Sequence, residues 1–169
     1  MIELINVKKD TRITKRKVNK GFNLSDLLPQ SNIFLLHNIN HKKQLFAEVA
    51  FISEKYTNYS KNKILKLLLS KENRENSGIG GGVALPNIKI PSIEKSLGIF
   101  LKLNKPITYN AIDNEPIDLI FVLLTSSKNL TTYLNELAYI SRLFSKKKTL
   151  QNIRASLDNE TIHAVITND

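Results

Sequence analysis

The sequence predicts a mixed α/β fold with one central mixed sheet of about five strands, flanked by helices. Three observations predict it. Leucine or isoleucine occupies every second position from 97 to 103, as in a strand with one buried face. Residues 119–124 are apolar without interruption, as in a central strand covered on both faces. Apolar side chains recur at helical spacing from residue 45 to residue 56.

The first half of the chain adds shorter elements to these. We expect a helical turn at residues 23–28, closed by Pro29, and a strand at 33–36. A helix over residues 61–69 follows the helix over 45–56. The polar and glycine-rich stretch 70–82 is predicted to be a loop that is too long to be a simple connection.

The second half continues with a hairpin and helices. Residues 104–116 are predicted to be a turn or hairpin between the two main strands. Three helices are expected at the C-terminal end, over 133–144, about 150–155 and 161–166. Asp158 or Asn159 is the expected N-cap of the last one.

Composition limits the class of protein. The chain has 169 residues, 41% of them hydrophobic, which is enough for one domain with a core. It has no cysteine, and no apolar run approaches the roughly 18 residues of a membrane span. The first residues lack the apolar segment of a secretory signal, so a cytoplasmic protein is predicted.

Basic residues are concentrated at the N-terminus. Residues 1–21 hold seven Lys or Arg and two acidic residues, so they carry +5 of the formal +10. We expect a flexible basic extension there, followed by a folded domain over 22–169. Such a segment suits an acidic partner or nucleic acid. Because it has no interleaved aromatic residues and no nucleic-acid motif, a solvated extension without specific nucleic-acid binding is favoured.

The glycine-rich stretch before Asn87 lacks the context of a nucleotide site. A phosphate-binding loop needs Lys and then Ser or Thr after its glycines, followed by a helix. Here residues 83–86 read VALP, which is strand-like and then interrupted by Pro86. No strand precedes Gly78 either, as a dinucleotide site would need, so no cofactor is expected.

Metal and acid–base sites are also disfavoured. The three histidines, His37, His41 and His163, form no ligand pattern and are expected to be exposed side chains without a role. No Ser-His-Asp set and no pair of carboxylates in contrasting environments is evident. Conventional catalysis is therefore not predicted.

Several segments together resemble one family. Residues 77–86, SGIGGGVALP, resemble the active-site segment of the IIA domains of the fructose, mannitol and nitrogen phosphotransferase systems, which reads Ser/Thr-Gly-Ile-Gly-x-Gly-Ile/Val-Ala-Ile/Val-Pro-His. Residues 111–121, AIDNEPIDLIF, resemble a second motif of that family. Residues 24–28 and the Leu-x-x-Leu-Ala run 134–138 resemble its opening and a later helix. The resemblance spans residues 22–169, and nitrogen-regulatory IIA proteins are the nearest type.

The resemblance implies a phosphoryl-accepting histidine after Pro86, framed by Gly78, Gly80 and Gly82. Asn87 stands there instead, and a carboxamide nitrogen is not a phosphoryl acceptor because its lone pair is delocalised. Tyr133 stands where the family usually has a supporting histidine.

Two further positions depart from the family's pattern. Lys71 replaces a phosphate-holding arginine, keeping the charge but losing the bidentate geometry, and is followed by the expected Glu72. Glu75 replaces a small residue and brings negative charge toward the site.

These changes predict a regulatory protein that keeps the frame of a IIA domain, accepts no phosphate and acts by binding protein partners. The small histidine phosphocarrier protein is one candidate partner. The expected contact face surrounds Asn87 and includes Lys71, Arg74 and Lys89. Three alternatives stay open: a phosphocarrier that uses another histidine, a nucleic-acid or membrane-surface binder that acts through the basic extension, and a degenerate protein without a role.

Overall fold

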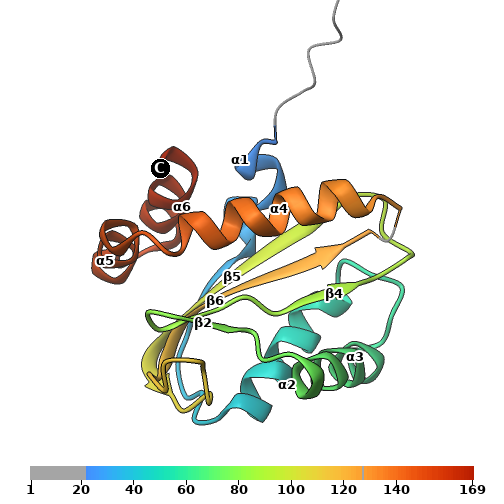
Figure 1. Ribbon diagram of the computed structural model, residues 1–169, viewed down its shortest axis with the longest axis horizontal. Coiled ribbons are helices and arrows are strands. Elements are labelled where there is room, and N and C mark those ends of the chain that lie inside the picture. Colours follow the sequence, from blue (N-terminus) through green and yellow to red (C-terminus); the bar gives the residue numbers. More distant parts are fainter. Residues whose placement is uncertain (1–21, 127) are drawn as a thin grey trace, which may run out of the picture.

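The computed structural model describes residues 22–126 and 128–169 (Figure 1). The basic extension expected at 1–21 lies outside this range. The described residues form six strands in a single mixed sheet. The strands are β1 (Ile33–Leu36), β2 (Gly78–Gly80), β3 (Val83–Ala84), β4 (Asn87–Lys89), β5 (Leu97–Ile107) and β6 (Ile117–Thr125).

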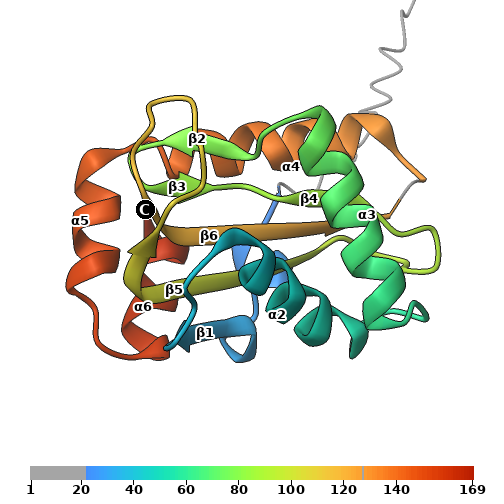
Figure 2. The ribbon, with the colours of Figure 1, turned by 90° about the horizontal axis from the view of Figure 1, so that it is seen from below.

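Strands β5 and β6 form the centre of the sheet. They pair antiparallel, with Phe100 opposite Phe121, so the predicted hairpin between them is confirmed. Strand β1 pairs parallel with β5 on one side. On the other side β3 and β4 both run parallel to β6, one after the other along its edge, and β2 pairs antiparallel with β3 (Figure 2). The sheet has six strands instead of about five because glycine and proline divide residues 78–89 into three short pieces.

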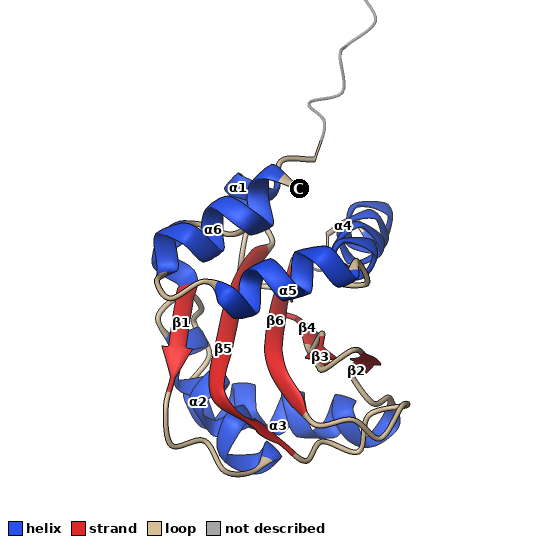
Figure 3. Ribbon diagram, turned by 90° about the vertical axis from the view of Figure 1, so that its left-hand side faces the viewer, coloured by secondary structure: helices blue, strands red, loops and turns tan. Residues whose placement is uncertain are grey.

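Helices cover both faces of the sheet (Figure 3). One face carries α2 (Lys42–Glu54) and α3 (Lys61–Arg74). The other carries α1 (Leu24–Leu27), α4 (Leu130–Leu143), α5 (Lys147–Ala155) and α6 (Asn159–Asn168), with a 3-10 turn, η1 (Gln30–Asn32), entering β1. In the described part of the chain, no helix combines the length and the apolar character needed to cross a membrane.

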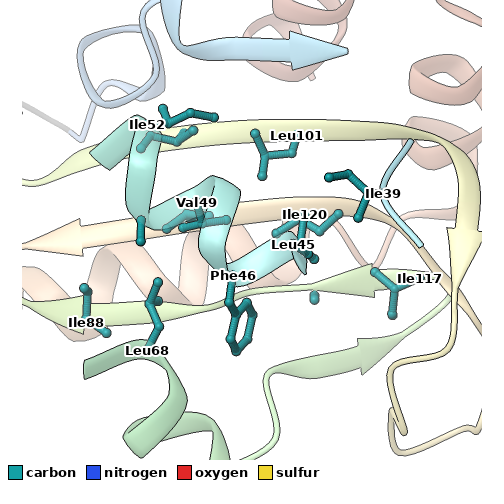
Figure 4. Close-up of a cluster of buried hydrophobic side chains, with 14 of the residues drawn as sticks. Ile39, Leu45, Phe46, Val49, Ile52, Leu68, Ile88, Leu101, Ile117 and Ile120 are labelled. Carbon is teal, nitrogen blue, oxygen red and sulfur yellow. The ribbon is translucent and has the colours of Figure 1, made fainter. Parts of the chain in front are cut away.

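Each face of the sheet has its own core. The α2/α3 side is packed with aliphatic residues and Phe46, drawn in Figure 4 with Val49, Leu68 and Ile120. On the opposite side Phe144 packs against Phe100 and Phe121, with ring centroids 5.6 Å apart in each case. The predicted strand 119–124 is buried on both faces, as its unbroken apolar run indicated.

Helix α3 is longer than the sequence analysis predicted. It continues through Arg74, and β2 covers Gly78–Gly80, so the expectation of a loop over residues 70–82 is wrong for its first five residues and for this short strand. Ser70, Asn73 and Arg74 are exposed, and polar residues on the outer face of a helix give no signal that the helix ends. The extra turn has a consequence for the site, because it places Lys71 and Glu72 on a helix.

Most of the α-helices begin at side-chain caps, and α5, which follows Lys146, is an exception. Asp158 caps α6 by accepting from the Thr161 amide at 2.8 Å, as predicted. Ser60 caps α3, and Asn129 caps α4 through the Thr132 amide at 3.1 Å. His41 caps α2 by accepting from the Gln44 amide.

A carboxyl group is buried between α4 and the end of the sheet. Glu136 is only 7% exposed, and its Oε2 atom has no hydrogen-bond partner. Burial raises the pKa of the Glu136 carboxyl above its ordinary value. The other charged side chains around it are Asp26, Glu94, Lys95 and Lys128.

The variant Glu136→Gln is expected to be more stable than the natural protein at pH 7, by about 1 kcal/mol, because a buried ionised group without a full set of partners costs free energy. Since the pKa of Glu136 is raised in the fold, the folded state retains the proton more strongly than the unfolded chain. The natural protein therefore loses stability as the pH rises from the ordinary pKa of glutamate through the raised pKa of Glu136. Below the ordinary pKa of glutamate, the variant is no longer more stable than the natural protein. Urea unfolding from pH 4 to pH 8 measures this; a pH-independent difference would contradict it.

Candidate functional site

Asn87 stands at the start of strand β4, where the chain leaves the glycine loop. Pro86 is buried, and its carbonyl accepts from the Leu123 amide of β6 at 2.9 Å. Asn87 is in register with Leu123. Two central contacts therefore fix the backbone on which the Asn87 side chain is presented.

Three of the residues singled out from the sequence meet at this side chain. The Tyr133 hydroxyl, from α4, donates to Asn87 Oδ1 at 2.7 Å. The Lys71 ammonium, from α3, donates to the same oxygen and lies 3.5 Å from the Tyr133 hydroxyl. Residues separated by 16 and 46 positions in the chain thus form one polar cluster, which we call the Asn87 cluster: Lys71, Asn87 and Tyr133.

The hydrogen bonds fix the orientation of the Asn87 amide. An ammonium and a phenol both donate to it, so the atom that receives them must be the carbonyl oxygen, which has two lone pairs. The amide nitrogen points the other way and donates to the Leu85 carbonyl at 3.1 Å. Both lone pairs of the Asn87 carbonyl oxygen therefore accept hydrogen bonds from within the protein.

Positive charge surrounds Tyr133. The ammonium groups of Lys71 and Lys89 lie 5.9 Å and 5.5 Å from the centre of its ring, within the range of cation–π attraction. Burial lowers the pKa of Lys71, which nearby Glu75 opposes. Burial also raises the pKa of Tyr133, with a further contribution from Glu75, so the phenol keeps the proton that it donates to Asn87.

Glu72 holds the start of the glycine loop against α3. Its carboxylate accepts from the Ser77 amide at 3.1 Å and pairs with the Lys42 ammonium of α2 at 2.5 Å. The Ser77 hydroxyl is 2.6 Å from that of Tyr109, which is almost fully buried. Burial, reinforced by the charge of Glu72, raises the pKa of Tyr109 far above its usual value. Glu72 therefore positions the loop and does not face the Asn87 side chain with a free carboxylate.

Three consecutive glycines allow the loop to turn back toward the sheet. Gly80, Gly81 and Gly82 have φ values of +95°, +66° and +78°, a region that side-chain-bearing residues rarely adopt. The Gly81 amide donates to Asp113 at 2.9 Å. The Gly82 carbonyl accepts from the backbone amides of residues 118 and 119.

A salt bridge fixes the same loop from the C-terminal side. The Arg154 guanidinium, at the end of α5, binds Asp118 through two bonds of 2.8 Å and 2.7 Å and donates to the Gly81 carbonyl at 2.7 Å. The Lys102 ammonium donates to the carbonyls of Ile153, Arg154 and Ser156 and so secures the end of α5. Sequence analysis did not identify the roles of Asp118, Arg154 and Lys102. Asp118 lies in the quoted motif 111–121, whereas nothing local indicates that Arg154 reaches it.

A small pocket of about 170 Å³ opens beside the Asn87 cluster. Its lining includes Lys71, Asn87 and Glu75, together with apolar surface from Ile79 and Leu137. Glu75 thus lies where the sequence placed it, near the side chain of residue 87. Two further basic side chains are exposed near the cluster in the sequence. Arg74 lies at the end of α3, three residues after Lys71, and Lys89 lies on β4, two residues after Asn87. In the described ranges, no three His, Asp or Glu side chains are grouped as metal ligands.

None of the three histidines is among the residues that line this pocket. His41 is the N-cap of α2, and His37 is exposed after β1. The expectation that all three are exposed is wrong for His163, which is half-buried and lies 2.9 Å from the Leu28 carbonyl, because α6 packs against α1 and the start of β1.

The polar groups of the Asn87 cluster are hydrogen-bonded to one another. The lone pair of the Asn87 amide nitrogen is delocalised, and those of its oxygen accept from Lys71 and Tyr133, whose phenol keeps its proton. The surrounding lysines, the small pocket and exposed Ile79 provide charge, shape and apolar area, which are the usual elements of a protein contact surface.

Known proteins share this arrangement of elements. Residues 26–169 match the family model described as phosphoenolpyruvate-dependent sugar phosphotransferase system, EIIA 2. The nitrogen regulatory protein of Bradyrhizobium diazoefficiens is 32% identical over 143 residues, which cover 85% of this chain and 94% of that protein.

Solved structures agree on the fold. The crystal structure of nitrogen regulatory protein IIA-Ntr from Neisseria meningitidis superposes with a TM-score of 0.80 at 27% identity, covering 85% of this chain and 99% of that one. The mannitol IIA enzyme of Escherichia coli, solved in complex with phosphorylated IIB, has a TM-score of 0.64. At 10% identity, over 82% of this chain and 95% of that one, it shows the shared fold alone.

Proposed function

Because the chain belongs to the EIIA 2 family of the phosphoenolpyruvate-dependent sugar phosphotransferase system, we propose that it is a nitrogen-regulatory IIA-type protein that accepts no phosphoryl group. It acts instead by binding other proteins, in the cytoplasm, in a permanently unphosphorylated state. The observation that carries the proposal is the Asn87 cluster, in which an amide oxygen accepts from both Lys71 and Tyr133.

The chemistry of the cluster supports the absence of phosphoryl transfer. A phosphoryl acceptor must present a free lone pair to the incoming phosphorus in line with the leaving group. At residue 87 the only lone pairs of an sp² atom belong to the amide oxygen, and two donors occupy them. Lys71 is placed to hold an anion, yet Glu75 lines the same pocket and would repel a phosphoryl group.

Two observations suggest what kind of protein binds here: the charge of the surface around Asn87 and the complex formed by a protein of the same fold. The contact face around Asn87 combines Lys71, Arg74 and Lys89 with exposed Ile79, so it suits a protein surface that is acidic around an apolar centre. The mannitol IIA enzyme named above binds phosphorylated IIB. By analogy, the small histidine phosphocarrier protein and IIB-type proteins are the first candidates for partners here.

A phosphocarrier function that uses a different histidine is the second candidate and is less favoured. His41 is engaged in capping α2, and His163 lies against the Leu28 carbonyl. Neither lines the pocket at Asn87. The nucleic-acid alternative rests on residues 1–21, which lie outside the described residues.

Charge reversal on the contact face tests the binding proposal. The double variant Arg74→Glu/Lys89→Glu is expected to bind the small histidine phosphocarrier protein at least about tenfold more weakly, because it replaces attraction by repulsion at the rim. It leaves the hydrogen bonds of the Asn87 cluster intact. Titration calorimetry at low and high salt measures the affinity. The matched control is Lys147→Glu/Lys148→Glu, which reverses the same number of charges at exposed positions on α5. Equal affinity of the natural protein, the double variant and the control would show that Arg74 and Lys89 are not part of the binding surface.

A further inference from the structure

A second and larger pocket, of about 620 Å³, opens on the other side of α4. Tyr133 and Leu137 of that helix turn toward the Asn87 side, and Leu137 lines the first pocket. Thr132, Asn135 and Glu136 line the second. The remaining walls come from α1, from the residues before β5 and from the end of β6. Its volume is in the range of sites that hold small molecules.

Glu136 is the exceptional residue of this pocket. It is more than nine-tenths buried, and one of its carboxylate oxygens has no hydrogen-bond partner. The two hydroxyls close to it in the lining, those of Ser96 and Thr125, are within 3.2 Å of each other. Buried carboxylates in proteins are normally paired. The Ser96 hydroxyl is hydrogen-bonded to the Glu136 carboxyl group, but the second oxygen, Oε2, is left without a donor, which is a sign of a binding role.

The charge of the lining favours a cation. Three acidic residues, Asp26, Glu94 and Glu136, line the pocket together with two lysines, Lys95 and Lys128, and of these five only Glu136 is buried. The pocket is therefore net acidic in a chain whose formal charge is +10. Hydroxyl and amide side chains make up much of the remaining surface and suit a polar ligand. The described residues group no three carboxylate or imidazole side chains around a common point, so an organic cation fits better than a metal ion.

We propose that this pocket binds a small amine, whose ammonium group pairs with the Glu136 carboxylate while its polar part is held by the hydroxyl and amide side chains of the lining. The site is separate from the Asn87 cluster and does not depend on the function proposed for it. The amine supplies a positive charge and the hydrogen-bond donor that the Oε2 atom of Glu136 lacks within the described residues.

The test uses the full chain and a panel of defined probes: methylammonium, ethanolamine, putrescine and spermidine, with 1,4-butanediol as the uncharged analogue of putrescine. Amide chemical shifts in ¹H–¹⁵N spectra are followed during titration. We expect at least one amine to cause saturable shifts at Ser96, Thr125 and Thr132, and the diol to cause none. The variant Glu136→Gln is expected to weaken that binding by at least about tenfold.

The control is Glu160→Gln, which removes the same charge from an exposed position on α6 and is expected to leave the affinity unchanged. Failure of every amine to produce saturable shifts overturns the proposal, as does equal binding by the natural protein and Glu136→Gln. The chain's own amines provide a further arm, because residues 1–21 contain seven Lys or Arg. In a variant of the full chain, these seven residues are changed to Gln. If a free amine binds to this variant and not to the natural protein, a basic side chain of residues 1–21 occupies the pocket, and the proposal of a free ligand is overturned.

Discussion

The triple variant Asn87→His/Tyr133→His/Lys71→Arg is expected to gain one phosphoryl group when it is incubated with a phosphorylated histidine carrier. The substitution at residue 87 supplies an imidazole lone pair. The other two restore the supporting histidine and the arginine that the family resemblance implies around an acceptor. The backbone that presents residue 87 is held by β6 and by the glycine loop, neither of which the variant changes.

The single variant Asn87→His is expected to accept phosphate at least about tenfold more slowly than the triple variant. Lys71 and Tyr133 now donate to the side chain of residue 87, and the same donors would bond to the ring nitrogen and occupy its lone pair. Breaking one charge-assisted hydrogen bond costs about 1.5–3 kcal/mol, and 1.4 kcal/mol corresponds to a tenfold rate. Phosphoryl incorporation over time, followed by intact mass, gives both rates.

The control is Asn62→His, on the exposed face of α3, which adds a histidine away from the site. Incorporation into that control at the rate of the triple variant would show that transfer is unspecific. If the triple variant stays unmodified, the three substitutions are not sufficient, and either Glu75 in the pocket or a changed docking surface prevents the transfer.

Gly82→Ala is expected to lower the free energy of unfolding by about 2–4 kcal/mol. Gly82 has a φ of +78°, and a side-chain carbon there would clash with the Arg154 guanidinium and lie 3.0 Å from the Asp118 carboxylate. Both groups are fixed by their mutual salt bridge, so the substitution adds the cost of breaking it to the cost of a left-handed residue.

Gly81→Ala is the matched control. Its φ is +66°, but a side-chain carbon would meet only Leu150, at an ordinary 3.4 Å. We expect a loss of about 1 kcal/mol, from the backbone conformation alone. Urea unfolding midpoints separate the cost of the backbone conformation from the cost of breaking the salt bridge. An equal loss of stability in both variants would contradict the prediction, because the Arg154–Asp118 salt bridge would then contribute nothing to the difference.

The members of the Asn87 cluster were predictable only through the family resemblance, which implies their positions relative to two motifs. The segment 77–86 fixes the position of Asn87, and Lys71 and Tyr133 stand at recognisable offsets from that segment and from the Leu-x-x-Leu-Ala run. The main strands were predictable without it, since alternation and unbroken apolar runs report burial directly. The hydrogen bonds among the three side chains required the structure.

Contacts between distant segments were not predictable in this way. Arg154 reaches Asp118 and Gly81 only because α5 packs beside the loop, and no feature around residue 154 indicates this. Glu136 had a signal that was not used: it lies three residues after Tyr133 and four before Ile140, on the stripe that faces the protein interior. The end of α3 was misplaced because five polar residues fit a solvent-facing helical turn as well as a loop.

The most direct test of the central claim is a phosphotransfer measurement on the natural protein. The full chain is incubated with phosphoenolpyruvate, the first enzyme of the phosphotransferase system and the histidine phosphocarrier, and its intact mass is recorded. A IIA protein that has the histidine serves as the positive control in the same mixture. We predict that the control gains one phosphoryl group and that the natural protein gains none. A phosphorylated natural protein would contradict the account, and mapping the modified residue would then identify the acceptor that replaces Asn87.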